Sequence, residues 1–353
     1  MPGVALFARD LHGNNIGVYL GCDERGTSLA SDSTVCLASV GKLAIALLVL
    51  RLVDEGRITL TDSVHSLVDL PYGKVGQATV GNLLSHRADV PCIISGEVLG
   101  YGRELTAERL RAYWRGLDRG GQGKRVRYSD VAFGILSDVV ESVMARPLGE
   151  CLTTLNALLG TRLRLGMPPD PDFIRVSGLP TKHTDESIRP FNSAYWYNLA
   201  APWGAISGAP DDGLRLLRGY AEGGLVLSEP LRRLAVTDPD GGALAGELPG
   251  AENHVGVGPY ATIEWEQCEW GLGVELKGSK FPHWSPSEAG PASFGHGGAS
   301  GVLVWHDPIA GISWGITGTR TSYTGWLFRY GPLVGKAVFE SLEAAEDRTE
   351  LSL

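Results

Sequence analysis

The sequence has no stretch long enough to cross a membrane as a helix, and positive charge is scarce. Its longest uninterrupted apolar run, residues 43–50, is far shorter than the roughly 20 residues that a membrane-spanning helix needs. Residues 1–5 show neither the basic nor the apolar segment of a signal peptide. Lysine and arginine number 31 against 40 acidic residues, and the formal charge is −9. We therefore expect a cytoplasmic protein with no nucleic-acid and no membrane partner.

Cysteines are also few. The chain has five, an odd number, and they are widely scattered. They are Cys22, Cys36, Cys92, Cys151 and Cys268. This spacing indicates neither a disulfide framework nor a Cys-x-x-Cys metal site. Reduced, mostly buried thiols are expected, with no metal and no cofactor.

What remains is an ordinary globular composition. The 353 residues are 43% hydrophobic and 20% charged, which is enough for a sizeable core and gives no sign of disorder. The 48 glycines are many and cluster late in the chain, as in an enzyme with tight strand turns and sites lined by backbone. No internal repeat is apparent.

Strand patterns lie at both ends of the chain and helix patterns lie between them. Strands are expected at 4–8, 16–20, 270–276, 302–305 and 312–317, and helices at 39–56, 79–87, 106–117, 129–144, 212–220 and 332–346. An isolated hairpin is marginal in water, so the first two strands should join the C-terminal strands in one antiparallel sheet. The predicted fold class is α/β (α+β), an antiparallel sheet flanked by helices with an inserted all-helical lobe. We expect residues 1–60 and 205–353 to form the sheet domain, residues 61–204 the helical domain, and the active site to lie in the cleft between them.

Ser39 and Lys42 stand at the start of the first helix. They are three residues apart and so share one helix face. The Lys42 amine can take or pass the hydroxyl proton of Ser39, and free backbone N–H groups at a helix start can hold a developing oxyanion. The alternative is an ordinary helix-capping Ser followed by an unrelated Lys.

Two later stretches can complete such a site. Tyr128-Ser129-Asp130 opens the predicted helix at 129–144, and the Gly-rich stretch 293–301 precedes a predicted strand. Ser39-x-x-Lys42, Tyr128-x-Asp130 and His296-Gly297-Gly298 together resemble the three motifs of the class C β-lactamase superfamily. That superfamily includes DD-peptidases, family VIII carboxylesterases, D-amino-acid amidases and transacylases. The likeness spans residues 39–317, and the segments 52–60 and 79–87 also resemble the family.

The resemblance implies a role for each residue. Ser39 would be the acylated nucleophile, with Lys42 and Tyr128 sharing the work of the base. The backbone N–H groups of Ser39 and Ala299 would form the oxyanion hole, with Ala299 starting the strand that follows the third motif. The glycines Gly297 and Gly298 would let that strand approach the substrate closely.

Two positions depart from the family pattern. The second motif usually ends in Asn, whereas an ionised Asp130 only accepts hydrogen bonds and would pair with Lys42. The third motif is usually Lys-Thr-Gly in β-lactamases, where the cation and hydroxyl bind a substrate carboxylate; His296 here is mostly neutral. Both changes argue against efficient β-lactamase or DD-peptidase activity and favour the esterase and transacylase branches.

Other residues allow further interpretations. The aromatic cluster at 191–203 includes Trp196 and Trp203, which either pack in the core or line the substrate pocket. His86 is expected to serve helix packing. His306-Asp307 invites a Ser-His-Asp triad, but no Gly-x-Ser-x-Gly elbow accompanies it.

The sequence therefore predicts a serine acyl-transfer enzyme that forms an acyl-Ser39 intermediate from a small ester or amide. Water would resolve it in an esterase or amidase, and an amine or alcohol acceptor in a biosynthetic transacylase. A β-lactamase or DD-peptidase is the first alternative, and a non-enzymatic binding or sensor protein on the same fold is the second. The partners expected are a small-molecule acyl donor and an acceptor.

Overall fold

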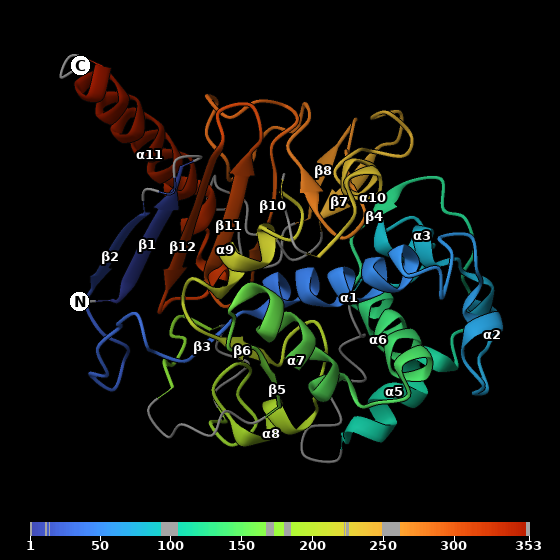
Figure 1. Cartoon of the computed structure of the whole chain (residues 1–353). Coiled ribbons are helices and arrows are strands. Elements are labelled where there is room, and N and C mark those ends of the chain that lie inside the picture. Colours follow the sequence, from blue (N-terminus) through green and yellow to red (C-terminus); the bar gives the residue numbers. More distant parts are fainter. Residues whose placement is uncertain are drawn as a thin grey trace.

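The computed structural model describes residues 2–10, 13, 15–92, 105–166, 173–179, 185–221, 223, 226–248 and 262–350, with side chains as far as residue 341. In these parts of the chain, one large sheet and a group of helices lie on either side of a central helix, α1 (Figure 1). The turn expected around residues 12–15 falls largely outside the described residues.

The large sheet joins the two ends of the chain. Its six strands follow the order β2-β1-β12-β11-β10-β9, and every pair is antiparallel. The strands are β1 Val4–Arg9, β2 Asn15–Leu20, β9 Glu275–Leu276, β10 Phe294–Gly298, β11 Val302–Asp307 and β12 Ile312–Gly318. Val4 on β1 pairs with Gly318 on β12. The prediction that the N-terminal hairpin completes a C-terminal sheet is confirmed.

The helices mostly begin where the sequence indicates. Those of the α type are α1 Lys42–Asp54, α2 Val64–Leu67, α3 Val80–Leu84, α5 Ala107–Arg115, α6 Asp130–Met144, α7 Leu148–Leu159, α8 Ala194–Asn198, α9 Asp212–Leu217, α10 Glu229–Ala235 and α11 Trp326–Glu350; 3-10 turns are η1 Ala38–Gly41, η2 Lys74–Gln77 and η5 Ser322–Thr324. Thr79, Thr106 and Ser129 accept backbone N–H groups as N-caps of α3, α5 and α6. Gly56 takes a positive φ of 68° just past α1, as expected of a glycine that ends a helix.

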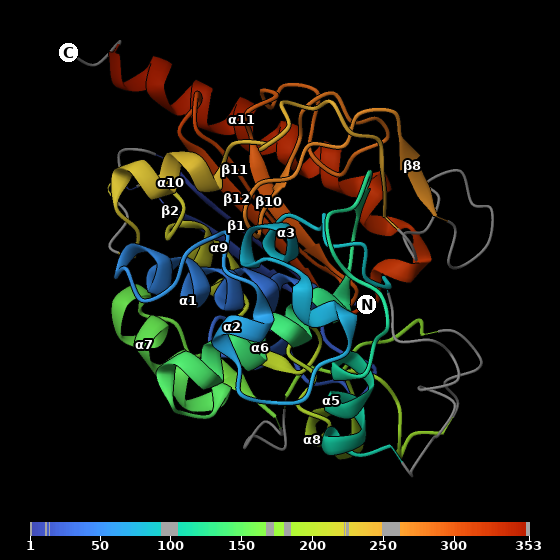
Figure 2. The same ribbon diagram turned by 90° about the vertical axis from the view of Figure 1, so that its right-hand side faces the viewer.

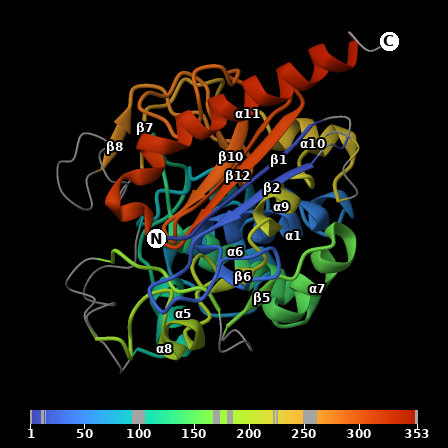
Figure 3. The ribbon, with the colours of Figure 1, turned by 90° about the vertical axis from the view of Figure 1, so that its left-hand side faces the viewer.

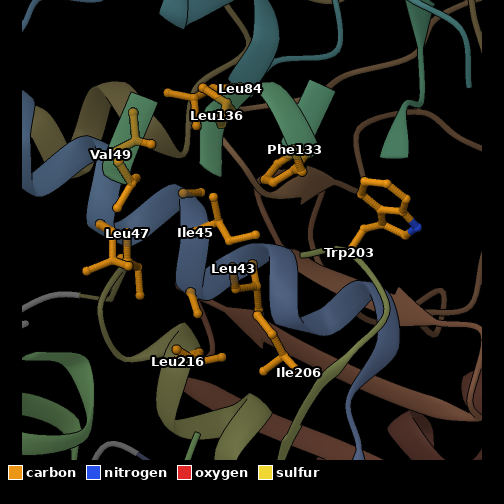
Figure 4. Packing of buried hydrophobic residues seen from close by; sticks show 14 of the residues in the cluster. Leu43, Ile45, Leu47, Val49, Leu84, Phe133, Leu136, Trp203, Ile206 and Leu216 are labelled. Atoms are coloured by element: carbon orange, nitrogen blue, oxygen red, sulfur yellow. The ribbon is translucent and has the colours of Figure 1, made fainter. Parts of the chain in front are cut away.

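The central helix α1 is buried on almost every side. Its residues from Lys42 to Leu50 are all buried, because a helix that is apolar all round is stable only inside the protein. Leu43 and Ile45 lie near Phe133 of α6 and Ile206, as Figure 4 shows. Burying one Leu or Ile side chain completely stabilises the folded protein by roughly 1.5–3 kcal/mol relative to leaving it exposed. This packing fixes the start of α1, where Ser39 and Lys42 lie.

The other face of the large sheet is covered by α11. Figures 2 and 3 show this long helix lying across the sheet on the side away from α1. Trp314 and Ile316 of β12 share a buried cluster with Phe328 and Phe339 of α11. The helix begins at Trp326, earlier than the expected residue 332, and Pro332 lies inside it.

Two small sheets were not predicted, because their strands are only two or three residues long. One is β3 Val35–Cys36, β6 Ile206–Gly208 and β5 Arg164–Leu165; the other is β4 Val126–Arg127, β7 Gly246–Leu248 and β8 Ile263–Trp265. The segment 61–204 is therefore largely helical but also contributes β4 and β5. The domain boundaries at residues 60 and 205 stay a prediction. These small sheets matter because β3 leads into η1 and β4 leads into Tyr128.

Candidate active site

Ser39 lies in the 3-10 turn η1, directly ahead of α1. The turn is held against β6, since a Cβ atom on Gly41 would lie 2.9 Å from the Cβ atom of Ile206. Ala38 has a positive φ of 44°, a conformation that costs a non-glycine residue about 1–3 kcal/mol. The protein therefore holds a strained residue immediately before Ser39, a feature the sequence does not reveal.

Lys42 is the centre of the polar site. Its Nζ atom lies 2.8 Å from Ser39 Oγ, 2.6 Å from Tyr128 Oη and 2.7 Å from Asp130 Oδ1. The Lys42 side chain is 0% exposed. The structure thus brings together the Ser, the Lys, the Tyr and the Asp that the sequence proposed, from two segments 86 or more residues apart.

Tyr128 and Asp130 reach this point from the start of α6. Ser129 caps the helix, and its own hydroxyl donates to the carbonyl of Pro91. The Asp130 N–H donates to the carbonyl of Cys92, 2.7 Å away. A side chain in the first turn of a helix is favoured when it is anionic, which suits Asp130.

Burial and the Asp130 charge set the proton affinities of the two candidate bases. Burial lowers the pKa of Lys42, and the Asp130 carboxylate limits this fall. Burial raises the pKa of Tyr128 well above its usual value, and Asp130 raises it further. The contacts favour a resting state in which the Lys42 ammonium pairs with Asp130 beside a neutral phenol.

The third motif lies within a strand and not in a turn that precedes one. His296, Gly297 and Gly298 belong to β10, and Ala299 is the first residue of the following turn, which corrects the expectation that it begins a strand. A Cβ atom on Gly298 would lie 2.7 Å from the Leu37 carbonyl oxygen and 3.5 Å from Ser39 N. The end of β10 therefore lies directly against the backbone of the Ser39 turn.

Hydrogen bonds that the sequence analysis missed hold this junction. The Ser300 hydroxyl donates to the Cys36 carbonyl at 2.6 Å, and the Thr321 hydroxyl donates to the Ala299 carbonyl at 2.6 Å. Both hydroxyl-bearing residues are buried. The first bond ties the turn after β10 to the strand before Ser39, and the second ties that turn to the segment that follows β12. Ser and Thr are common in any turn, so only the fold reveals this role.

His296 is a buried, neutral residue beside Tyr128. Side chains alternate along a strand, so His296 faces the same side of β10 as Gly298, toward the Ser39 turn. Its Nδ1–H donates to the Gly297 carbonyl at 2.7 Å, and its ring centroid lies 5.9 Å from that of Tyr128. Burial and the Lys42 charge lower its pKa to about 4. His296 is therefore uncharged at neutral pH.

His86 packs against the same tyrosine. Its ring lies 4.7 Å from Tyr128 and 4.8 Å from Trp270, and its Nδ1 accepts the Ser129 N–H. Burial holds its pKa well below the usual value. These contacts agree with the packing role expected for His86.

The two predicted pocket tryptophans lie in different surroundings. Trp203 is buried edge-on against Trp114 in the main core. Trp196 is only partly buried and packs against the cluster that includes Ala38, as Ala299 does. Trp196 is thus placed near the Ser39 turn, while a role in lining a pocket stays a prediction for both.

The alternative Ser-His-Asp triad has no support among the described contacts. His306 lies on β11, where its Nδ1 is 2.8 Å from Ser313 Oγ on the neighbouring strand. Asp307 accepts the N–H groups of Ile309 and Ala310 and so fixes the next turn. Both side chains therefore have structural partners at the far end of the sheet hairpin.

None of the helices in the described part of the chain has the length and the apolar composition that crossing a membrane requires. The same part of the chain has no group of three or more His, Cys, Asp or Glu side chains placed to hold a metal ion.

Comparison with known structures gives the same fold at low sequence identity. EstCE1, described as a hydrolase with promiscuous acyltransferase activity, is 18% identical with a TM-score of 0.70, over 96% of this chain and 93% of that one. Simvastatin synthase from Aspergillus terreus is 19% identical with a TM-score of 0.68, over 98% and 91%. The D-amino acid amidase from Ochrobactrum anthropi SV3 is 17% identical with a TM-score of 0.68, over 98% and 95%.

The family of this chain is identified from its sequence. No curated protein sequence matches the chain. The model of the family described as Beta-lactamase matches residues 1–325, which are most of the chain and include Lys42 and its three partners Ser39, Tyr128 and Asp130. The fold and the Ser-Lys-Tyr group agree with this match, and the chain belongs to the β-lactamase family.

Proposed function

We propose that the protein is a serine acyl-transfer enzyme in which Ser39 attacks a small ester or amide and is acylated. The observation that supports this is the single hydrogen-bonded group formed by Ser39, Lys42 and Tyr128. A nucleophile within reach of a proton acceptor, held in turn by a third group, is the arrangement that covalent catalysis needs.

The Lys42–Tyr128 pair gives the proton a path in each half-reaction. The Ser39 proton passes to the Lys42–Tyr128 pair as Oγ bonds to the substrate carbonyl carbon. The same pair returns it to the leaving alcohol or amine. The N–H groups of Ser39 and Ala299 would hold the oxyanion, since β10 ends against the Ser39 turn. Water or an amine or alcohol acceptor then attacks the acyl carbon and gives its proton to the same pair, and the bond to Ser39 Oγ breaks as the pair returns that proton to Oγ.

An esterase, amidase or transacylase fits the site better than a β-lactamase or DD-peptidase. Recognition of a penicillin or peptide carboxylate calls for a free cation, whereas His296 is neutral and Lys42 is already paired with Asp130. All five cysteines lie in the described residues, and no disulfide joins them, which fits a reducing compartment such as the cytoplasm and a metabolic or biosynthetic substrate there.

A panel of esters and amides, offered with and without amine and alcohol acceptors and analysed by mass spectrometry, tests this proposal. Free acid as the main product indicates hydrolysis, and conjugates that form at the expense of free acid indicate transfer. Turnover of the β-lactam nitrocefin comparable to that of the best ester would favour the β-lactamase alternative. Products equal in wild type and Ser39→Ala would contradict a serine mechanism.

The pH dependence of the activity tests the role of Asp130. We expect kcat/KM to rise with pH as the Lys42–Tyr128 pair loses a proton. Because Asp130 raises the pKa of both groups, Asp130→Asn should move this rise to lower pH. The measurement is the pH profile of kcat/KM for an uncharged ester. An unchanged profile, or a move to higher pH, would contradict the assigned effect.

A further inference from the structure

Within the described residues, the side-chain N–H donors of Lys42 and His296 beside Ser39 are all in use. An ammonium group has three N–H donors, and those of Lys42 have three acceptors, on Ser39, Tyr128 and Asp130. Lys42 therefore has no hydrogen left for a substrate group unless one of these contacts breaks. His296 adds none, because its one N–H donates to the Gly297 carbonyl.

Asp130 is different, because half of its carboxylate is free. Oδ1 accepts from Lys42, while Oδ2 has no hydrogen-bond partner within the described residues. Its side chain is 18% exposed, beside a Lys42 side chain that is 0% exposed. An ionised carboxylate only accepts hydrogen bonds. Asp130 Oδ2 can therefore accept a hydrogen bond from a substrate group beside Ser39.

The distance to Ser39 suits one particular kind of substrate. Ser39 Oγ and Asp130 Oδ1 bond to the same nitrogen, so they lie no more than about 5.5 Å apart. A donor one or two carbons from the carbonyl that Ser39 attacks can therefore reach Asp130. A carboxylate in that place would meet the Asp130 anion, and the Lys42 cation beside it is already paired.

We propose that Asp130 Oδ2 binds a protonated primary amine on the acyl part of the substrate, so that the preferred substrates are esters or amides of amine-bearing acids. This inference rests on the proposed function and names its substrate class. The acyl part remains on Ser39 after the leaving group departs, so an amine there would stay bound to Asp130 through both half-reactions.

Three matched phenyl esters test the proposal. The acyl groups are 3-aminobutanoate, 3-methylbutanoate and 3-carboxybutanoate. They place an ammonium, a methyl or a carboxylate group on carbon 3 of the same chain. Phenol release gives kcat/KM for each with wild type, Asp130→Asn and Ser39→Ala. A hydrogen bond between charged groups changes kcat/KM by about tenfold or more. The wild type should therefore prefer the 3-aminobutanoate ester over the 3-methylbutanoate ester by at least that factor.

The readout is the ratio of kcat/KM for the 3-aminobutanoate ester to kcat/KM for the 3-methylbutanoate ester within each variant. A general loss of activity does not affect this ratio. In Asp130→Asn the amine preference should fall about tenfold, and the carboxylate ester should gain relative to the other two. Asp118→Asn removes an exposed carboxylate that pairs with Lys74, and should keep the wild-type ratio.

The results that contradict the amine site differ from those that contradict the proposed function. The amine site is wrong, and the proposed function stands, if Ser39-dependent hydrolysis is equally fast for the 3-aminobutanoate and 3-methylbutanoate esters. The same holds if Asp130→Asn keeps the wild-type preference. If no ester releases phenol in a Ser39-dependent manner, the amine site and the proposed function both fall.

Discussion

Replacing Lys42 with methionine should lower kcat/KM for ester hydrolysis by about 10³-fold, because it removes the group that bonds Ser39, Tyr128 and Asp130 at once. Methionine has a similar length and no charge, so it fills the buried space that Lys42 occupies. The loss should therefore appear in the chemistry rather than in the fold.

Steady-state kinetics with one good ester, together with thermal unfolding, check this prediction. Lys74→Met is the matched control, since Lys74 is largely exposed and pairs with Asp118 on the surface. It should leave kcat/KM near the wild-type value. A Lys42→Met protein that keeps a tenth of the wild-type activity would show that Lys42 is not needed for proton transfer.

Asp138→Ala should lower the free energy of unfolding by about 3–5 kcal/mol, because it removes a buried carboxylate shared by one buried and three partly buried side chains. The Asp138 carboxylate accepts from Arg111 at 2.8 Å, from Arg115 at 2.8 and 2.9 Å, and from Trp114 Nε1 at 2.9 Å. It also accepts the Tyr72 hydroxyl. The variant leaves the buried Trp114 N–H without its acceptor and two guanidinium groups without this carboxylate.

Urea denaturation followed by tryptophan fluorescence measures the change. Asp138→Asn keeps the shape but not the charge, and should lose less stability than Asp138→Ala. Asp118→Ala, at an exposed ion pair, should change stability by no more than about 0.5 kcal/mol. A loss below about 1 kcal/mol for Asp138→Ala would mean that α5 and α6 are held together by apolar packing alone.

Much of the fold could be predicted from local patterns. Thr79, Thr106 and Ser129 each mark a helix start because their side chains satisfy free N–H groups, whatever the rest of the fold does. The two- and three-residue strands could not be found this way, because they have too few residues to show a period. Asp138 was missed for a related reason: its partners come from α5 and from Tyr72, so only the tertiary structure shows them.

The candidate site was predicted in its residues but not in its supports. Ser39, Lys42, Tyr128 and Asp130 carry functional groups whose order along the chain is distinctive, and the structure brings them together. The positive φ of Ala38 and the hydroxyl contacts of Ser300 and Thr321 depend on backbone geometry, which composition and spacing do not encode.

The most direct test of the account is the intact mass of the protein after brief exposure to an activated phenyl ester, with peptide mapping of any adduct. We expect the wild type to gain the mass of one acyl group, located on Ser39, and Ser39→Ala to gain none. An adduct of equal yield in Ser39→Ala, or no adduct on the wild type with any ester while the protein is folded, would contradict it.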